Sequence, residues 1–494
     1  MTRTLPALLR RARGRGAPQD RGPAPGAWTR PDAPAAGFAR QGRDRSRFTL
    51  PDLRVSTATA SVAYPFLAQA PLTRKGTFLG TNLGTGAPFA FSPFELYRDG
   101  LITNPNILVA GEIGSGKTNA TCALTLRSIP LGYKVAAVDA KHDWARFART
   151  YGGAAISIGP GCGNRLNPLD VSDALLRARV DAQGTRIDPA ILAKASQLRL
   201  LEGLIEIRLE RSLRVDERTA VAIALEQALH ASGGRPILSD VAQALRAPDP
   251  RLAAGIARTP AELLDAGNAA RWAFDGLLST VARDLFDGPS TTRFDSTAPI
   301  VAIDLSDLYN DHASLSIAFT CASAWMESAL ATPGNGQRFA VYDEAWRVLA
   351  HAHGAIDRLQ QQFRLARAWG LSNVLVLHNL RDTLNVGDAG SAERNKAESL
   401  LALAGTKVIG YQPAKELPGT AAALDLTGAE VDVIANASRG EFLVKLQTTA
   451  GVRSYRLRVD LHPHELQWWD TTQGMQHAGD RLPAAPAAGD EGAP

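Results

Sequence analysis

Two adjacent carboxylates follow a short apolar run near residue 340. The stretch RFAVYDEAW (338–346) places Asp343 and Glu344 directly after a run that is typical of a buried strand. Neighbouring negative charges disfavour each other, but a cation bound beside them would make the pair tolerable. The alternative is that the strand simply ends at the surface, where acidic residues are common.

A glycine-rich loop upstream supplies the other half of such a site. The stretch NILVAGEIGSGKTNATCALTL (106–126) predicts a strand, a loop and a helix, and its loop fits the pattern G-x-x-x-x-G-K-[ST]. Glycines let backbone N–H groups surround a polyphosphate, and the N-terminus of the helix adds partial positive charge. The predicted nucleotide-binding residues are Gly111, Glu112, Ile113, Gly114, Ser115, Gly116, Lys117 and Thr118.

The loop and the carboxylates together predict a site for ATP hydrolysis. Lys117 can reach the β- and γ-phosphates, and Thr118 can offer its hydroxyl to Mg²⁺. Asp343 fits a second position around the metal, and Glu344 fits the base that orients the attacking water. We therefore expect ATP and Mg²⁺ as cofactors and Mg-dependent ATP hydrolysis as the activity.

The composition is that of an ordinary globular protein, with 45% hydrophobic and 21% charged residues among 494. The three cysteines, Cys122, Cys162 and Cys321, are far apart and form no metal-ligand pattern, so we expect reduced thiols. No apolar run approaches the roughly 18–20 residues of a membrane-spanning helix. These features predict a cytoplasmic protein without a membrane span of its own, either free or peripheral on the cytoplasmic face of the membrane.

The positive charge is concentrated at the start of the chain. The first 50 residues hold eleven Arg against three Asp, whereas the net charge of the whole chain is only +5. Because this segment is also rich in Pro, Gly and Ala, we expect residues 1–48 to form a disordered tail. The tail is either a solvated extension or a contact for an anionic partner, DNA or lipid headgroups.

Alternating strands and helices predict an α/β fold with a RecA-like P-loop core and a mostly parallel sheet. The first half of the core spans 101–170, and a small β-rich segment (49–100) precedes it. Residues 171–296 show helical spacing and include the capping box that begins at Thr259, so they predict an all-helical insertion or a separate domain beside the core. The second half of the core spans 297–475. Its strands are expected near 299–306, 338–345, 373–379 and 406–412, followed by an antiparallel edge hairpin at 440–463 and a disordered tail at 476–494.

With these motifs in order, the chain resembles the TraC-like, VirB-type ATPases of type IV secretion and conjugation systems, which belong to the FtsK–HerA superfamily. The resemblance covers roughly 76–472 and rests on GEIGSGKT, VDAKHDW, RLNPLD, VAIDLS, VYDEAW and LDLTGAEVDVIANASRGEFLVKL. It implies a motor that hydrolyses ATP to energise assembly or substrate transfer. It also implies a homo-hexamer that works with secretion or conjugation machinery at the inner face of the membrane.

Two further catalytic candidates come from the same resemblance. The stretch RLARAWGLSNVLVLHNLRD is similar to the superfamily segment that ends in Thr-Gln, but His378 and Asn379 stand in place of that pair. Either His378 or Asn379 is therefore a candidate sensor of the γ-phosphate, the alternative for His378 being a buried histidine without a catalytic role. Arg367 matches an arginine that can complete the site of a neighbouring subunit, with Arg364 as the second choice.

Other functional classes stay open on the sequence. A DNA translocase of the HerA or FtsK kind, or a DNA-transfer coupling ATPase, would use the same loop and carboxylates. A scaffold that binds nucleotide and hydrolyses little of it is the non-enzymatic alternative. Stimulation of ATP hydrolysis by DNA would favour the translocase, and co-purification with membrane components would favour the secretion motor.

Overall fold

The computed structural model describes residues 72, 76–171, 179–180, 186–330, 336–344, 353–377 and 392–469. The chain divides into two units, Met1–Phe66 and Leu67–Pro494, and all the described residues belong to the second unit. The two predicted disordered tails and His378 lie outside the described residues.

A mixed sheet of eleven strands lies at the centre of the described residues, in the order β2-β1-β13-β12-β11-β3-β10-β9-β4-β8-β5. The pairs from β11 to β5 are parallel, and the pairs from β2 to β11 are antiparallel. The mostly parallel sheet is therefore confirmed. Its strands are β1 (Thr77–Asn82), β2 (Pro88–Phe91), β3 (Ile107–Ala110), β4 (Lys134–Asp139), β5 (Ala154–Ser157), β8 (Ile300–Asp304), β9 (Arg338–Tyr342), β10 (Leu371–Leu377), β11 (Thr406–Ile409), β12 (Glu441–Thr448) and β13 (Gly451–Val459).

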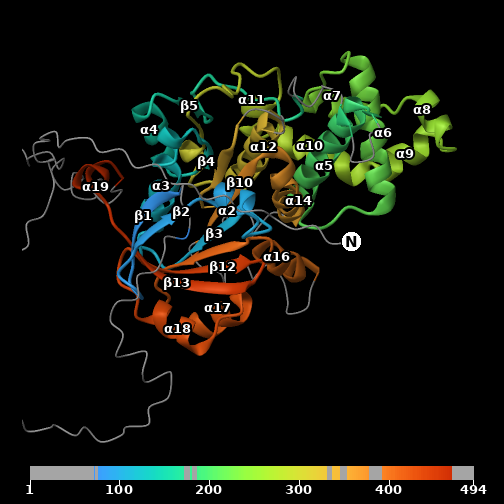
Figure 1. Ribbon diagram of the computed structural model, residues 1–494. Helices are drawn as coiled ribbons and strands as arrows, with labels where there is room; N and C mark the ends of the chain where they lie inside the picture. The colour runs from blue at the N-terminus through green and yellow to red at the C-terminus, as the bar shows by residue number, and fades with distance from the viewer. Residues whose placement is uncertain are drawn as a thin grey trace, which may run out of the picture. The chain divides into compact units, whose positions relative to one another are not determined.

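Helices cover both faces of this sheet, which is why its central parallel strands are apolar along their whole length. On β3, Ile107 and Val109 pack with the helices of one face, and Leu108 and Ala110 pack with those of the other. Figure 1 shows α3 and α4 apart from α12 and α14, with the strands between them. The first face carries α2 (Pro93–Arg98), α3 (Lys117–Leu126), α4 (Asp143–Thr150) and α19 (Pro463–Trp469), and the second carries α12 (His312–Leu330), α14 (His353–Trp369), α16 (Ala392–Ala402), α17 (Leu417–Leu424) and α18 (Gly428–Ala435).

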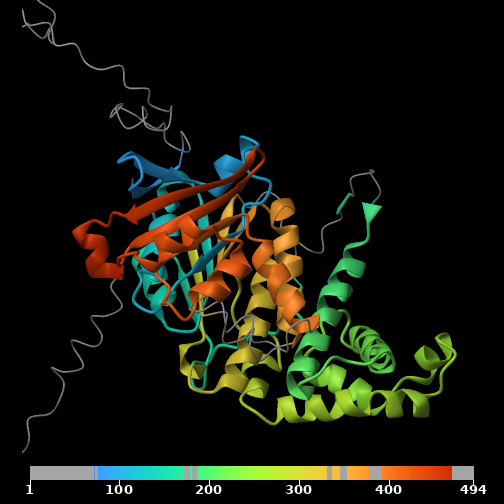
Figure 2. The same cartoon turned by 90° about the horizontal axis from the view of Figure 1, so that it is seen from below.

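The C-terminal hairpin does not lie at the edge of the sheet, so that part of the prediction is wrong. Strands β12 and β13 do form an antiparallel hairpin, but β13 also pairs with β1, and β1 pairs with β2. Figure 2 shows β1 and β2 (blue) beside the hairpin (orange to red), although the two segments are far apart in the sequence. The glycine-rich segment before the P-loop therefore extends the same sheet.

The insertion consists mainly of helices, and most of its buried apolar side chains join the core cluster of one sheet face. Thr259 starts α9 as predicted, because its Oγ1 accepts from Glu262 N at 3.2 Å and Glu262 Oε2 accepts from Thr259 N at 2.7 Å. A short antiparallel pair, β6 (Arg179–Val180) with β7 (Arg186–Ile187), shows that the insertion is not all-helical, since strands of two residues leave no detectable alternation. The helices are α5 (Pro189–Leu209), α6 (Val215–Ala231), α7 (Leu238–Arg246), α8 (Pro250–Gly255), α9 (Pro260–Ala266), α10 (Asn268–Leu278) and α11 (Ala282–Phe286).

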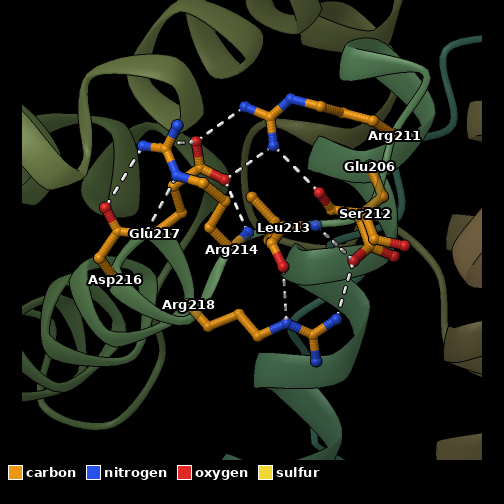
Figure 3. A network of polar contacts seen from close by, with 8 residues as sticks. All are labelled: Glu206, Arg211, Ser212, Leu213, Arg214, Asp216, Glu217 and Arg218. Carbon is orange, nitrogen blue, oxygen red and sulfur yellow. Dashed lines mark hydrogen bonds and ion pairs between the residues drawn. The ribbon is translucent and has the colours of Figure 1, made fainter.

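A polar network fixes the turn between α5 and α6 (Figure 3). The buried carboxylate of Glu217 accepts two hydrogen bonds from Arg211, at 2.7 and 2.8 Å, and one from Arg214 N at 2.8 Å. The hydrogen bonds from Arg211 lower the pKa of Glu217, although burial opposes them. Glu206 accepts from Leu213 N at 3.0 Å and from Arg218 at 3.1 Å. The network therefore sets the angle at which α6 leaves the long helix α5.

Candidate nucleotide-binding site

The glycine-rich loop joins the buried strand β3 to the first turn of α3. Gly114 (φ +84°) and Gly116 (φ +96°) both adopt left-handed backbone conformations, which favour glycine because it has no Cβ. Gly116 is also the N-cap of α3 and, because glycine has no side chain, it makes no side-chain cap hydrogen bond. The first N–H groups of α3 therefore remain available to an anion at this end of the helix.

Two other glycines pack directly beneath this loop, and sequence reasoning missed both. Gly410, which follows β11, donates its N–H to Ala110 O at 2.8 Å, and Gly440, which precedes β12, donates to Ser115 O at 2.9 Å. A Cβ on Gly111 would lie 3.2 Å from Gly410 Cα, so the two backbones touch. The available signals for this close approach were a glycine inside the predicted strand 406–412 and a glycine at the start of the predicted hairpin 440–463.

Lys117 lies within the loop rather than in solvent, with 5% of its surface exposed. Its Nζ donates to Gly111 O at 2.7 Å and to Glu112 O at 3.0 Å. Burial lowers the pKa of Lys117 to about 8, and the carboxylates of Asp343 and Glu344 oppose that shift. The predicted lysine and the two predicted carboxylates are therefore within electrostatic range of one another.

Asp343 and Glu344 follow β9, which is separated from β3 by β10 alone. Both are buried, with exposed fractions of 5% and 3%. Trp144 Nε1 donates to Asp343 Oδ2 at 3.2 Å, and Glu344 N donates to Asp343 Oδ1 at 3.0 Å. Since β3, β10 and β9 are parallel, their carboxyl ends share one edge of the sheet, where ligands of open α/β sheets bind.

The next strand in the sheet, β4, brings two more carboxylates to this edge. Burial raises the pKa of Asp139 to about 7, and burial with the nearby charge of Asp343 raises the pKa of Asp143 to about 6. Asp139 Oδ2 accepts from the backbone N–H groups of Trp144 at 2.7 Å and Ala145 at 3.2 Å. Asp139 therefore anchors the start of α4, and through it the indole that contacts Asp343.

The loop and carboxylates fit a polyphosphate with a hard cation. The hydroxyl of Ser115 is buried and has no hydrogen-bond partner among the described residues. A Cβ added to Gly114 would meet no atom within 4 Å, so the space in front of the loop is open. The half-buried Thr118 hydroxyl and the Asp343 carboxylate are oxygen donors, which Mg²⁺ prefers.

The predicted Arg367 is not part of this cluster. Its side chain is exposed in the last turn of α14, shortly before β10 begins. The nearby Gly370 O accepts from Arg338 N, at the start of β9, at 3.1 Å. Strand β10 spans Leu371–Leu377 and is therefore about 20 Å long, which places Arg367 at the edge of the sheet opposite the loop. Arg367 cannot serve the loop of its own chain.

Comparison with known proteins finds solved structures with a similar fold. No family model matches the chain, and no curated protein matches it by sequence. The structure is similar to VirB4 of Thermoanaerobacter pseudethanolicus, with a TM-score of 0.63 and 20% identity over 81% of this chain and 100% of that one. It is also similar to the plasmid coupling protein TrwB in complex with ADP and Mg²⁺, with a TM-score of 0.50 and 15% identity over 82% of this chain and 93% of TrwB. TrwB with the non-hydrolysable ATP analogue ADPNP gives a TM-score of 0.50 and 16% identity over 80% of this chain and 96% of TrwB. The chain therefore shares the fold of these proteins.

Proposed function

We propose that this chain is a P-loop ATPase motor that energises assembly or substrate transfer in a type IV secretion or conjugation apparatus. The observation that carries the proposal is the placement of the glycine loop and of the Asp343–Glu344 pair at one edge of the sheet, at the ends of strands separated only by β10. This placement supports phosphate binding and water activation by a single chain.

Each residue then has a role that its surroundings allow. Bound ATP supplies the phosphoryl group, and bound Mg²⁺ neutralises part of its charge. The backbone of Gly111–Thr118 holds the phosphates, and Lys117 turns from the carbonyl oxygens of its own loop towards them. Thr118 and Asp343 hold the cation. Glu344 accepts the proton of the attacking water on its carboxylate.

The comparisons support this proposal through the fold. The fold likeness covers the whole of the VirB4 chain, and the resemblance in the sequence motifs points to the same family. The name of the TrwB structure states that it holds ADP and Mg²⁺; this chain is proposed to bind a nucleotide and Mg²⁺ in the same way.

We further propose a homo-hexamer that acts at the cytoplasmic face of the inner membrane with secretion or conjugation components. None of the described helices is long and apolar enough to cross a membrane.

Measurement of ATP hydrolysis by the purified full chain tests the proposal. The wild type should hydrolyse ATP in the presence of Mg²⁺. Glu344→Gln should bind ATP without cleaving it, because the amide keeps the size of the side chain and removes the base. Glu398→Gln, which changes an exposed glutamate on α16, is the matched control and should hydrolyse ATP like the wild type. Hydrolysis by Glu344→Gln at the wild-type rate would contradict the assigned role.

A DNA translocase or DNA-transfer coupling ATPase is the second candidate. The likeness to the plasmid coupling protein TrwB and the Arg-rich first 50 residues favour it. Strong stimulation of ATP hydrolysis by double-stranded DNA would support this candidate, provided that deletion of residues 1–48 or added salt removes the stimulation. Co-purification with membrane components without any effect of DNA would support the secretion motor.

A further inference from the structure

A lysine that sequence reasoning did not select contacts the proposed catalytic base. Lys141 Nζ forms an ion pair with Glu344 Oε1. The side chain of Glu344 is almost fully buried, with 2% exposed, whereas 36% of the Lys141 side chain is exposed. The ion pair therefore joins a buried carboxylate to a lysine side chain that reaches solvent. The available signal was the position of Lys141, two residues beyond the end of β4 at the ligand-binding edge.

The backbone of Lys141 is held in place by a neighbouring carboxylate. Asp139 Oδ1 accepts from Lys141 N at 2.9 Å, while Asp139 Oδ2 anchors the first turn of α4. The backbone at the base of the side chain is therefore anchored, and the flexible methylene stem allows the ammonium to reach different partners. Burial lowers the pKa of Lys141, but Glu344 and Asp343 raise it by more, so the ammonium remains charged.

Glu344 itself is held in an unusual backbone conformation. Its φ of +57° lies in the left-handed region, which costs a non-glycine residue roughly 1 kcal/mol. Such a conformation persists only where the surroundings hold it, and the hydrogen bond from Glu344 N to Asp343 Oδ1 contributes to this here. The ion pair with Lys141 adds a contact to the Glu344 side chain, and a bound anion can compete for that contact.

Lys141 also lies within electrostatic range of the phosphate-binding lysine. The charge of Lys141 contributes to the lowered pKa of Lys117, after the larger effect of burial. An anionic group that reaches Lys117 therefore enters the field of Lys141 as well. A terminal phosphoryl group would bring more negative charge than the single carboxylate of Glu344.

We propose that Lys141 is a positioning residue that holds Glu344 until the terminal phosphoryl group of a bound nucleoside triphosphate draws the ammonium away. The carboxylate is then released to accept a proton from water. A nucleoside diphosphate, which lacks that group, would leave the ion pair intact. This inference rests on the proposed function and assigns recognition of the third phosphate to a residue of β4's carboxyl end.

Equilibrium binding of fluorescently labelled ADP and of a labelled, non-hydrolysable ATP analogue tests the inference. Lys141→Met should bind the ADP probe about as well as the wild type, and should lose about tenfold in its preference for the ATP probe, the equivalent of one charged contact. Lys141→Arg should restore most of that preference. Lys134→Met is the matched control, since it removes a positive charge from the other end of β4, where Lys134 donates to Ser296 O at 2.8 Å.

The ion pair itself is tested with the double variant. In Glu344→Gln the ammonium loses its carboxylate partner, so the preference for the ATP probe should rise above that of the wild type, and Lys141→Met should then reduce it by more than in the wild-type background. An unchanged preference in Lys141→Met, with ADP binding and thermal unfolding like the wild type, would refute the inference and leave the proposed function standing. Binding of neither probe by the wild type would refute both.

Discussion

The contact between Gly111 and its neighbours allows a sharp test of how the loop is held. A Cβ on Gly111 would lie 2.8 Å from Ser115 Oγ, 3.2 Å from Gly410 Cα and 3.4 Å from Gly410 N. A real Cβ essentially never lies as close to another heavy atom as the first of these distances. Gly111→Ala must therefore displace Ser115 or the end of β11, and overpacking of this kind costs about 1–3 kcal/mol.

Ser115→Ala separates the two sources of this cost. The buried Ser115 hydroxyl has no hydrogen-bond partner among the described residues, so its removal should not lower the free energy of unfolding and should raise it by up to about 1–3 kcal/mol. In the double variant Gly111→Ala/Ser115→Ala, the contact between the new Cβ and Ser115 Oγ is gone. Only the close approach of that Cβ to the Gly410 backbone remains. We therefore expect Gly111→Ala to cost about 1 kcal/mol less in the Ser115→Ala background than in the wild type, which is the recovery seen in the double variant.

The assay is urea-induced unfolding without nucleotide, followed by circular dichroism. Gly419→Ala is the matched control, because Gly419 lies in α17, a Cβ there would meet no atom within 4 Å, and alanine favours the helix by about 0.5–1 kcal/mol. Gly111→Ala should lower the unfolding midpoint and Gly419→Ala should raise it. A stability of Gly111→Ala equal to that of the wild type, or the absence of any recovery in the double variant, would refute the packing argument.

Four further predictions concern the site and the insertion. Lys117→Ala should lose most of its affinity for a fluorescent nucleotide, and unchanged affinity would exclude this loop as the site. Asp343→Asn should require at least about tenfold more Mg²⁺ for half-maximal hydrolysis, because one oxygen ligand loses its charge; an unchanged requirement would remove Asp343 from the metal site. A mixture of inactive Glu344→Gln and inactive Arg367→Ala subunits should recover part of the activity if Arg367 acts on a neighbouring subunit, and no recovery despite demonstrated exchange of subunits would exclude that role. Glu217→Gln should lose about 1–3 kcal/mol of unfolding free energy at pH 7. Because the folded-state pKa of Glu217 is lowered, this loss should be complete above the ordinary pKa of glutamate and should vanish as the pH falls through the folded-state pKa. A loss independent of pH would contradict the ionic origin.

The sequence predicted the local parts of the site well. The glycine pattern specified a strand, a loop and the start of a helix, and the structure contains them as β3, the loop and α3. Apolar runs located β9 at Arg338–Tyr342 and β10 at Leu371–Leu377 within about three residues, because a strand buried on both faces is apolar throughout. The start of α9 at Thr259 was specified by its own capping residues.

Arg367 illustrates where a motif is insufficient. Its place in the segment resembles that of a catalytic arginine, but the structure puts it at the edge of the sheet opposite the loop of its own chain. Because a strand is fully extended, the seven residues of β10 separate Arg367 from the opposite edge of the sheet by about 20 Å. A role in catalysis therefore requires a second subunit.

By itself, the sequence determined which segments form strands and helices and which residues can bind phosphate and metal, because periodicity, caps and glycine loops act over a few neighbouring residues. Only the tertiary structure decided that β10 alone separates β3 from β9, that β1 joins β13 within the sheet, and that Gly410 and Gly440 pack beneath the loop. It also decided that Lys141 forms an ion pair with Glu344. Each of these contacts joins residues far apart in the chain, and such pairings depend on the packing of the whole core rather than on any pattern that a single segment carries.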